Sequence, residues 1–258
     1  MKLDELLELL DDDLSWRKKE VSQLYALCVE KDVEVLRKSL LLVLYSHWEG
    51  FVKNAAKLYL HYVSKQKLKV GVLTVNFKTI SMKGLINNCY KSSDSLTLNN
   101  ELNFMDKFTQ KDEAKFQIGS NIMDDKDKTL INTTDNLSPD VFSNFCRIIG
   151  VKYKDAVSTK KKYLDDSFLG NRNKISHGTK IEFNEDELED FDLSQDSIQE
   201  LKQVVLAILD HFKQDIEEYA SQNFYLSEND EIRIEFDKFS EVKLDKTLHP
   251  EKYLKKLA

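Results

Sequence analysis

Residues 31–65 read KDVEVLRKSLLLVLYSHWEGFVKNAAKLYLHYVSK and carry the longest continuous pattern in the chain. Their apolar side chains recur at spacings of three and four residues, which places them on one face of an α-helix. The positions on this face are Leu36, Leu40, Val43, Leu44, Trp48, Phe51, Val52, Ala55, Leu58, Tyr59 and Tyr62. The pattern predicts one long helix, 31–65, as the central element of a helical core.

The composition of the whole chain favours an all-α fold. Its 258 residues include only 7 Gly and 2 Pro, and 32% are charged, which is typical of helices rather than of a turn-rich sheet protein. A hydrophobic content of 41% can fill one large core or two small ones. The three cysteines, Cys28, Cys89 and Cys146, form no CxxC pair, so we expect neither a disulfide framework nor a metal site.

Three later segments carry helix signals. Ser138 and Pro139 supply an N-cap and a first-turn proline, and Gly150 is a natural stop, so a helix is predicted between them. The apolar spacing predicts two further helices, at residues 159–177 and 196–223.

The predicted domain organisation is a single helical domain, 1–225, followed by a C-terminal extension, 226–258. The domain would begin with one or two N-terminal helices and contain a partly irregular insertion, 66–137. Within it, residues 79–90 could form a helix, whereas residues 91–100 and 119–136 are rich in Ser, Asn, Thr and Asp and indicate loops. In the extension, EIRIEFD at residues 231–237 alternates apolar and polar residues, as a strand does. The predicted fold is therefore an all-α bundle with an irregular insertion and a short strand-like tail.

The N-terminal sequence and the apolar runs bear on location. MKLDELLELLDDD has acidic residues where a signal peptide has a basic segment followed by an apolar one. The longest apolar run, Leu40–Tyr45, is far shorter than the roughly 20 residues that cross a bilayer. We expect a cytoplasmic protein without a membrane span.

Charge is sorted along the chain, although the net charge is -7. Gly50–Lys91 contains eight lysines and no Asp or Glu, and Arg147–Lys180 contains nine basic residues against three acids. Glu182–Asp192 holds seven acids and no base. This asymmetry has two interpretations, a surface for an anionic partner or ordinary solvated helix faces.

The segment Leu164–Gly178, LDDSFLGNRNKISHG, is the most informative for chemistry. A helix advances 100° per residue, so an apolar stripe should face the core. The stripe consists of Leu164, Phe168 and Ile175. The opposite side presents Asp166, Asn173 and His177, flanked by Arg172. Because that side points away from its own core, it must face solvent or another subunit; a His before Gly is also a common helix cap.

Three stretches carry a resemblance to the HEPN superfamily. Arg172–Gly178 resembles its signature of Arg, a polar residue, three residues and His, at the end of a helix. Leu44–Lys53, LYSHWEGFVK, is similar to the HWEGF-containing helix of the MAE-type (RiboL-PSP-HEPN-like) branch, and Asn136–Pro139 resembles the segment before its penultimate helices. The resemblance covers about Glu34 to Phe224.

The resemblance implies a helical bundle that dimerises so that two copies of the signature face each other and cut RNA without a metal or cofactor. His177 would be the general base, Arg172 would bind the phosphate, and Asn173 would orient the imidazole or contact the phosphate. The products would be 2′,3′-cyclic phosphate and 5′-OH ends. Relatives of this kind imply a toxin or an anti-phage effector, restrained or activated by a partner protein such as an antitoxin.

Other residues are weaker candidates. Glu49, His47 and Asp166 are candidates for supporting the catalytic residues, although a histidine such as His47 is more often packed or at an interface. Candidates for binding the RNA backbone, which requires charge more than geometry, are Lys160, Lys161, Lys162 and Lys174.

Two other functions remain open. One is a non-catalytic HEPN module that binds RNA or protein within a defence complex, and the other is a structural helical scaffold. The oligomeric state discriminates among them, because a strict monomer could not build a site from two chains.

Overall fold

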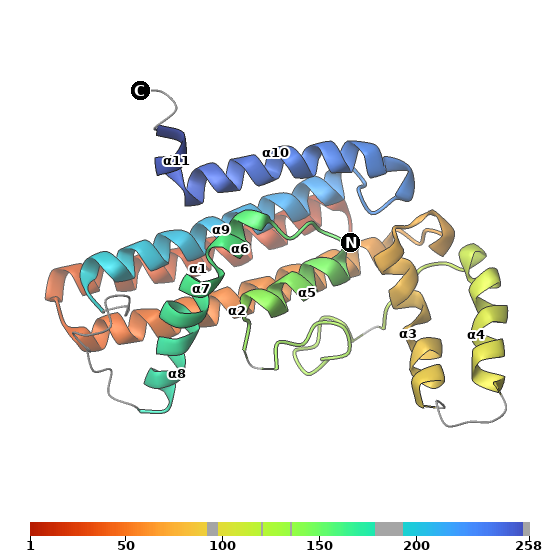
Figure 1. The fold of residues 1–258 in the computed structure, drawn as a ribbon, viewed down its shortest axis with the longest axis horizontal. Helices are drawn as coiled ribbons and strands as arrows, with labels where there is room; N and C mark the ends of the chain where they lie inside the picture. Colours follow the sequence, from red (N-terminus) through yellow and green to blue (C-terminus); the bar gives the residue numbers. More distant parts are fainter. Residues whose placement is uncertain (92–97, 120, 135, 179–192, 255–258) are drawn as a thin grey trace.

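The computed structural model describes residues 1–91, 98–119, 121–134, 136–178 and 193–254 (Figure 1). Throughout these residues the regular structure is helical and no β-strand occurs, so the all-α prediction is confirmed. No helix among them is long and apolar enough to cross a membrane. The acidic segment Glu182–Asp192, singled out by its charge, lies outside the described residues.

Three long helices form the body of the molecule: α1 (Leu3–Lys31), α2 (Glu34–Lys65) and α9 (Gln195–Ser221). They lie side by side, and each packs against the other two (Figure 1). The first two are joined by a tight turn at Asp32, which adopts a left-handed conformation with φ 47°. The predicted helices 31–65 and 196–223 are present, with boundaries that differ by at most three residues.

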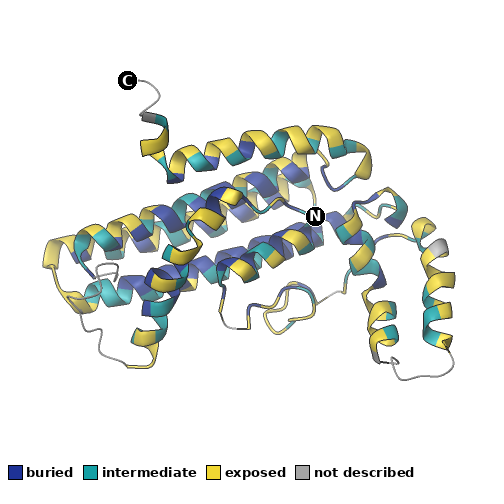
Figure 2. Cartoon of the chain, in the orientation of Figure 1, coloured by how far each residue is buried: buried dark blue, intermediate teal, exposed yellow. Residues whose placement is uncertain are grey.

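The central position of α2 explains its composition. Half of its residues are buried, and they surround the helix between residues 51 and 63 instead of following one stripe, as expected for a helix enclosed by neighbours. Figure 2 shows this buried interior running along α2 and α9. Even Lys57 is buried there, and its Nζ donates to the backbone oxygen of Asp124 at 2.8 Å.

Local signals correctly predict α5 (Pro139–Ile149). The Ser138 hydroxyl accepts a hydrogen bond from the backbone N–H of Val141, and Gly150 ends the helix with φ +80°. A side chain at Gly150 would also meet Asn76, whose side chain lies 2.7 Å from an ideal Cβ. Glycine is therefore required there for both its conformation and its small size.

The partly irregular insertion 66–137 contains a helix that the sequence pattern does not predict, α4 (Asn99–Gln110). It also contains α3 (Val75–Lys91) and the 3-10 turns Val70–Val72 and Lys111–Glu113. These helices form a hairpin that projects from one end of the bundle (Figure 1). The stretch after α4 is largely irregular, as predicted.

The predicted motif helix, 159–177, is helical but not regular. It consists of α6 (Asp155–Thr159), α7 (Lys161–Tyr163), a π-helix (Leu164–Gly170) and α8 (Asn171–Ser176). A π-helix turns by a smaller angle per residue than an α-helix, so the motif residues do not lie where a regular helix would place them.

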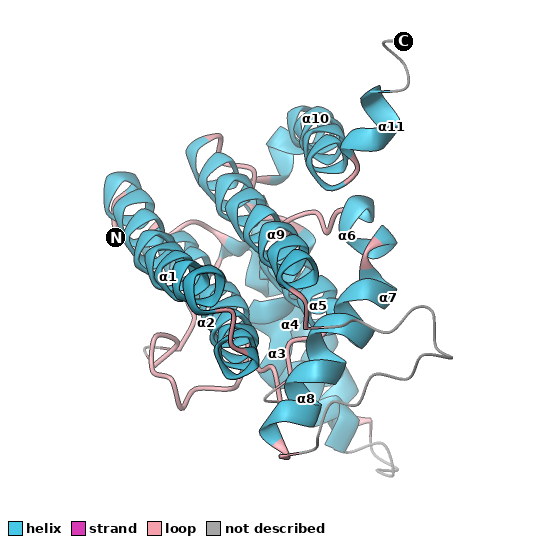
Figure 3. Ribbon diagram, turned by 90° about the vertical axis from the view of Figure 1, so that its left-hand side faces the viewer, coloured by secondary structure: helices cyan, strands magenta, loops and turns pink. Residues whose placement is uncertain are grey.

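The prediction of a strand-like tail is wrong. Residues 231–237 lie in α10 (Asp230–Leu248), which follows the turn Ser227–Asn229 and precedes α11 (Pro250–Leu254). Over the longer window the inward positions follow a spacing of four, and they are Phe236, Ser240, Leu244 and Leu248. Ile232 and Ile234, which suggested a strand, are 61% and 50% exposed. Figure 3 shows α10 at the edge of the bundle, beside α9.

Candidate active site around Arg172 and His177

The signature residues lie on α8 and at its end. The backbone N–H of His177 donates to the carbonyl of Asn173 at 3.0 Å, and Gly178 follows with φ +69°. The helix therefore stops at the histidine, and its side chain is exposed. Asn173 and Arg172 are each partly buried, one turn earlier. The histidine thus has access to solvent while the arginine is held against the protein.

Arg172 packs on an aromatic ring of the neighbouring helix. Its Cζ atom lies 4.2 Å from the centroid of the Tyr45 ring in α2, a cation–π contact. Its Nη1 donates to Oδ1 of Asn173 at 2.7 Å. The side-chain contact of Asn173 seen here is therefore with the guanidinium, and the structure gives no contact between this amide and the imidazole of His177.

Tyr45 is buried and its hydroxyl is held on both sides. The backbone N–H of Leu137 donates to the hydroxyl oxygen at 2.9 Å. The hydroxyl forms a further hydrogen bond with the Glu49 carboxylate, one helical turn along α2. Burial, with the Glu49 charge adding to it, raises the pKa of Tyr45 to about 12. Tyr45 is therefore a neutral hydrogen-bond donor at physiological pH.

Both backbone polar groups of Leu137 form hydrogen bonds with side chains of α2. Besides the N–H bonded to Tyr45, its carbonyl accepts a hydrogen bond from Trp48 Nε1 at 2.9 Å. Glu49 accepts a further bond from the hydroxyl of Thr133. The two segments that resemble the HEPN branch, 44–53 and 136–139, are thus in direct contact, and Tyr45 connects them to Arg172.

His47 points to a different neighbour. It lies two residues after Tyr45, about 200° around the helix, and faces α1. Its Nε2 is 2.6 Å from the Glu20 carboxylate, and its ring packs edge-on against Trp16 at 5.1 Å. Burial lowers its pKa. The structure therefore keeps His47 apart from Arg172. Glu49 is connected to Arg172 through a single residue, Tyr45.

The close approach of two helices in this region occurs at Gly50. A Cβ at Gly50 would lie 2.6 Å from Nη1 of Arg17 in α1, while one at Gly170 would meet only the Asp165 carbonyl oxygen at 3.4 Å. Arg17 is anchored by Asp13 at 2.9 Å. Gly50 therefore serves the packing of α1 on α2.

The remaining candidates lie on the surface of the motif segment. Asp166 is exposed and Lys174 is exposed on α8. Lys161 pairs with Asp140 at 2.7 Å, and this hydrogen bond raises the pKa of Lys161. Lys160 lies 5.7 Å from the Tyr163 ring, and Lys162 is exposed. The cationic side chains therefore line α7 and α8 without forming one compact cluster.

Several lysines of the stretch Gly50–Lys91 have contacts within the protein. Lys53 pairs with Glu49 at 3.7 Å and Lys69 with Glu113 at 2.6 Å, and Lys83 donates to the Thr129 carbonyl. These contacts favour the interpretation of ordinary helix faces. Among the described residues, no three His, Cys, Asp or Glu side chains are grouped to hold a metal.

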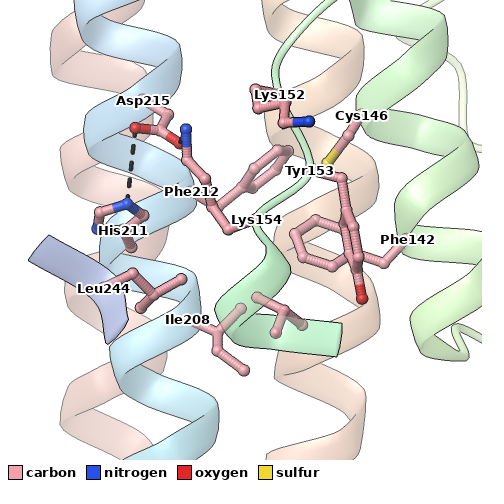
Figure 4. A pocket seen from close by; sticks show the side chains of 11 residues that line it. Phe142, Cys146, Lys152, Tyr153, Lys154, Ile208, His211, Phe212, Asp215 and Leu244 are labelled. Atoms are coloured by element: carbon pink, nitrogen blue, oxygen red, sulfur yellow. Dashed lines mark ion pairs between the residues drawn. The ribbon is translucent and has the colours of Figure 1, made fainter. Parts of the chain in front are cut away.

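A second ionisable cluster is buried where α10 packs on α9 (Figure 4). Lys154 Nζ lies 3.1 Å from Asp215 and 3.4 Å from Asp237, and all three are largely buried. The Ser240 hydroxyl donates to Asp215 at 2.6 Å and contacts His211 Nε2 at 2.8 Å. The adjoining cavity of about 10 Å³ has room for no more than one water molecule, so it admits no substrate.

Sequence reasoning missed Tyr45, Thr133 and Leu137. Tyr45 lies within the LYSHWEGFVK stretch, and Leu137 within NLSP. The resemblance therefore included both positions but did not predict their contacts. Nothing in the spacing indicates that an aromatic residue at 45 meets an arginine at 172.

The sequence profile of the MAE_28990-like HEPN family matches residues 6–225. The match begins in α1, so the first helix belongs to the family domain, whereas the motifs alone covered only about Glu34 to Phe224. No curated protein and no solved structure matches the chain significantly. The helices α10 and α11 lie beyond the matched residues.

Proposed function

The chain belongs to the MAE_28990-like HEPN family, and on that basis we propose that it is a metal-independent endoribonuclease. The family itself points to a ribonuclease or nucleotide-binding type of function. The observation that carries the finer proposal is the arrangement of α8, in which an exposed His177 ends the helix and Arg172, one turn earlier, is held on Tyr45. A base and a fixed cation on one surface suit phosphodiester cleavage.

In the proposed reaction, His177 takes the proton of a ribose 2′-OH. The 2′ oxygen forms a bond to phosphorus while the bond from phosphorus to the 5′ oxygen breaks. The departing oxygen takes a proton from the His177 of a second copy of the chain. The products are a 2′,3′-cyclic phosphate and a 5′-OH, and DNA is not cut because it lacks the 2′-OH.

Arg172 would bind the phosphate and stabilise the negative charge that grows on its oxygens. A guanidinium presents five N–H donors in a planar fork, which suits this role better than an ammonium group does. The bond from Nη1 to Asn173 fixes one of these donors, and the Cζ atom lies over the Tyr45 ring. The proposed role of Asn173 is therefore to fix the rotation of the guanidinium.

The need for a second proton donor supports a homodimer with a composite site. His177 is exposed, so a second α8 can approach it. A role as a toxin or anti-phage effector, with an antitoxin or an activating protein as a further partner, is part of the same proposal.

The primary test is cleavage of total tRNA and of a long single-stranded RNA in EDTA. We expect cyclic phosphate ends, and a loss of about 100-fold or more in His177→Ala and in Arg172→Ala. His61→Ala is the matched control, because it removes a partly exposed histidine of α2 away from α8. A folded dimer that binds RNA without cutting it would support the non-catalytic binding module instead.

A mixing experiment tests the composite site. Excess His177→Ala protein, added to a fixed amount of wild type and allowed to exchange subunits, should lower the activity per wild-type chain because hybrid dimers lack one histidine. Activity that stays constant while mass spectrometry detects the hybrids would show that each chain is self-sufficient.

A further inference from the structure

Tyr45 lies between two residues of the motif segment. The guanidinium of Arg172 covers its ring at 4.2 Å, and the ring of Phe168 packs against it edge-on at 5.8 Å. Phe168 and Arg172 are four residues apart, at the junction of the π-helix and α8. Tyr45 is only 4% exposed, so its ring forms a fixed surface beneath the arginine.

The hydroxyl of Tyr45 prevents the ring from moving along or around this surface. It accepts from Leu137 N–H at 2.9 Å and bonds to the Glu49 carboxylate. Leu137 is itself held by Trp48, and Glu49 by Thr133. The bonds that hold the ring thus come from α2 and from the loop before α5, and not from α8.

The cation–π contact with the Tyr45 ring holds the guanidinium at this position. Donation to Asn173 at 2.7 Å fixes the remaining rotation about the stack. An arginine that is fixed before the substrate arrives loses less side-chain freedom when it binds. Preorganised cations also stabilise a transition state without a cost of reorganisation.

We infer that Tyr45, held by Glu49 and the backbone of Leu137, is the positioning residue for Arg172. This inference rests on the proposed function, since it names what holds the phosphate-binding arginine of that site. Tyr45 touches no reacting atom, and it acts only through the guanidinium. Glu49 acts one step further away, by fixing the tyrosine hydroxyl.

Tyr45→Leu removes the ring on which Arg172 lies. Tyr45→Phe keeps the ring but removes the tether, which is the pair of hydrogen bonds that join the hydroxyl to Leu137 and Glu49. We expect kcat to fall about 5- to 30-fold in Tyr45→Leu, the range that a desolvated cation–π contact represents, with a smaller change in KM. In Tyr45→Phe we expect about a threefold fall. Tyr25→Leu is the matched control, since Tyr25 stacks on Lys202 at 3.5 Å in a different part of the bundle, and its kcat should not change.

NMR of the arginine side chains reads the stack without any activity. The chain has five arginines, so a spectrum of their Nε–H groups has few signals, and Arg172→Lys identifies the one from Arg172. The Tyr45 ring current should shift that signal in wild type and in Tyr45→Phe but not in Tyr45→Leu. Unchanged cleavage in a Tyr45→Leu protein whose Arg172 signal has moved would overturn the inference.

The proposed function and the inference fail separately. A wild type that does not cleave RNA counts against the nuclease, and the affinity of a His177→Ala background for single-stranded RNA then decides the role of Tyr45. Weaker binding with Tyr45→Leu, restored by Tyr45→Phe, supports positioning, while equal affinities contradict it. If Tyr45→Leu does not fold, Glu49→Gln provides the same comparison from the outer end of the tether.

Discussion

Two clusters of ionisable side chains contain similar residue types, but one is a candidate active site and the other stabilises the fold. Around α8, Arg172 lies on Tyr45 at the surface and His177 is exposed. Around α10, Lys154 and His211 are buried with Asp215, beside a cavity too small for a ligand. The buried cluster contains a histidine whose pKa is lowered to about 4 and an aspartate whose pKa is raised, although such shifts often mark catalytic sites. Access to solvent, and not the size of the shift, separates the candidate site from the structural one.

The buried cluster attaches the C-terminal helix to the family domain. Lys154 and Asp215 lie within the family match, whereas Asp237 and Ser240 lie in α10, beyond it. Because the Ser240 proton is given to Asp215, the serine oxygen accepts from His211 Nε2–H, and His211 is held neutral. These bonds satisfy buried groups that would otherwise destabilise the fold.

The largest expected effect comes from Lys154→Met. It leaves two carboxylates near each other without their cation, and breaking a buried pair in this way costs about 3–5 kcal/mol. Urea unfolding measures the loss, with exposed Lys152→Met as the control, which should change stability by less than about 0.5 kcal/mol. Arg172→Ala should show the reverse pattern, with cleavage lost and a smaller loss of stability, about 1–2 kcal/mol, because it removes the cation–π contact with Tyr45. A small loss in Lys154→Met would mean that water already reaches the cluster.

The next effect is a loss of stability in acid. Burial, together with the nearby charges of Lys154 and Lys243, lowers the pKa of His211 to about 4 from an ordinary 6.5. The unfolded chain therefore binds a proton at His211 more readily than the folded chain does. The contribution of neutral His211 to the free energy of unfolding is complete above about pH 6.5 and is lost as the pH falls towards 4. Its size is up to about 3 kcal/mol.

The measurement is the difference in unfolding free energy between wild type and His211→Gln from pH 7 to pH 4. The comparison is needed because Asp215, whose pKa burial raises, acts with the opposite sign. A difference that does not depend on pH would contradict the prediction. Cleavage near neutral pH should be the same in both proteins, since His211 lies outside the candidate site.

A smaller effect is expected from Glu241→Ala. The Glu241 carboxylate in α10 accepts hydrogen bonds from the backbone N–H groups of Asp155 and Ala156, at 2.9 and 2.8 Å, and so caps the start of α6. Loss of such a cap costs about 1 kcal/mol. Because α6 begins the segment that ends at His177, cleavage measured beside the control Glu235→Ala also tests whether the two clusters are independent. Reduced cleavage in a folded Glu241→Ala protein would show that they are coupled.

The sequence predicts what depends on local pattern. The bundle helices follow from apolar spacing, and α5 follows from Ser138, Pro139 and Gly150. The helix α4 was missed because Asn and Thr residues around it indicate a loop, and its packing against α3 is a tertiary effect. The strand-like tail was wrong because a seven-residue alternation also fits a helix whose Ile232 and Ile234 remain exposed.

The candidate site was predictable in its residues but not in its contacts. The motif identifies Arg172, Asn173 and His177, and apolar spacing correctly directs Leu164 and Phe168 inwards. The π-helix at Leu164–Gly170 was not foreseen, because the apolar spacing of this segment also fits a regular α-helix. The stack on Tyr45 depends on that turn and on a partner 127 positions away in the sequence, so no local pattern encodes it.

The smallest effect, and the finest comparison, concerns the exposed pair of Lys161 and Asp140 near the candidate site. Lys161→Ala should leave the unfolding midpoint unchanged, because an exposed pair contributes little to stability. If Lys161 contacts the RNA backbone, affinity for single-stranded RNA should fall equally for all sequences, and the salt dependence should decrease by about 0.7 in slope. Asp140→Ala should do the opposite, because it releases the lysine from its carboxylate. Filter binding at several salt concentrations, in a His177→Ala background, measures the affinity and its salt dependence. Equal slopes in this background protein, Lys161→Ala and Asp140→Ala would show that Lys161 does not contact the RNA. Lys174, on the same helix as Arg172, would then be the residue to test.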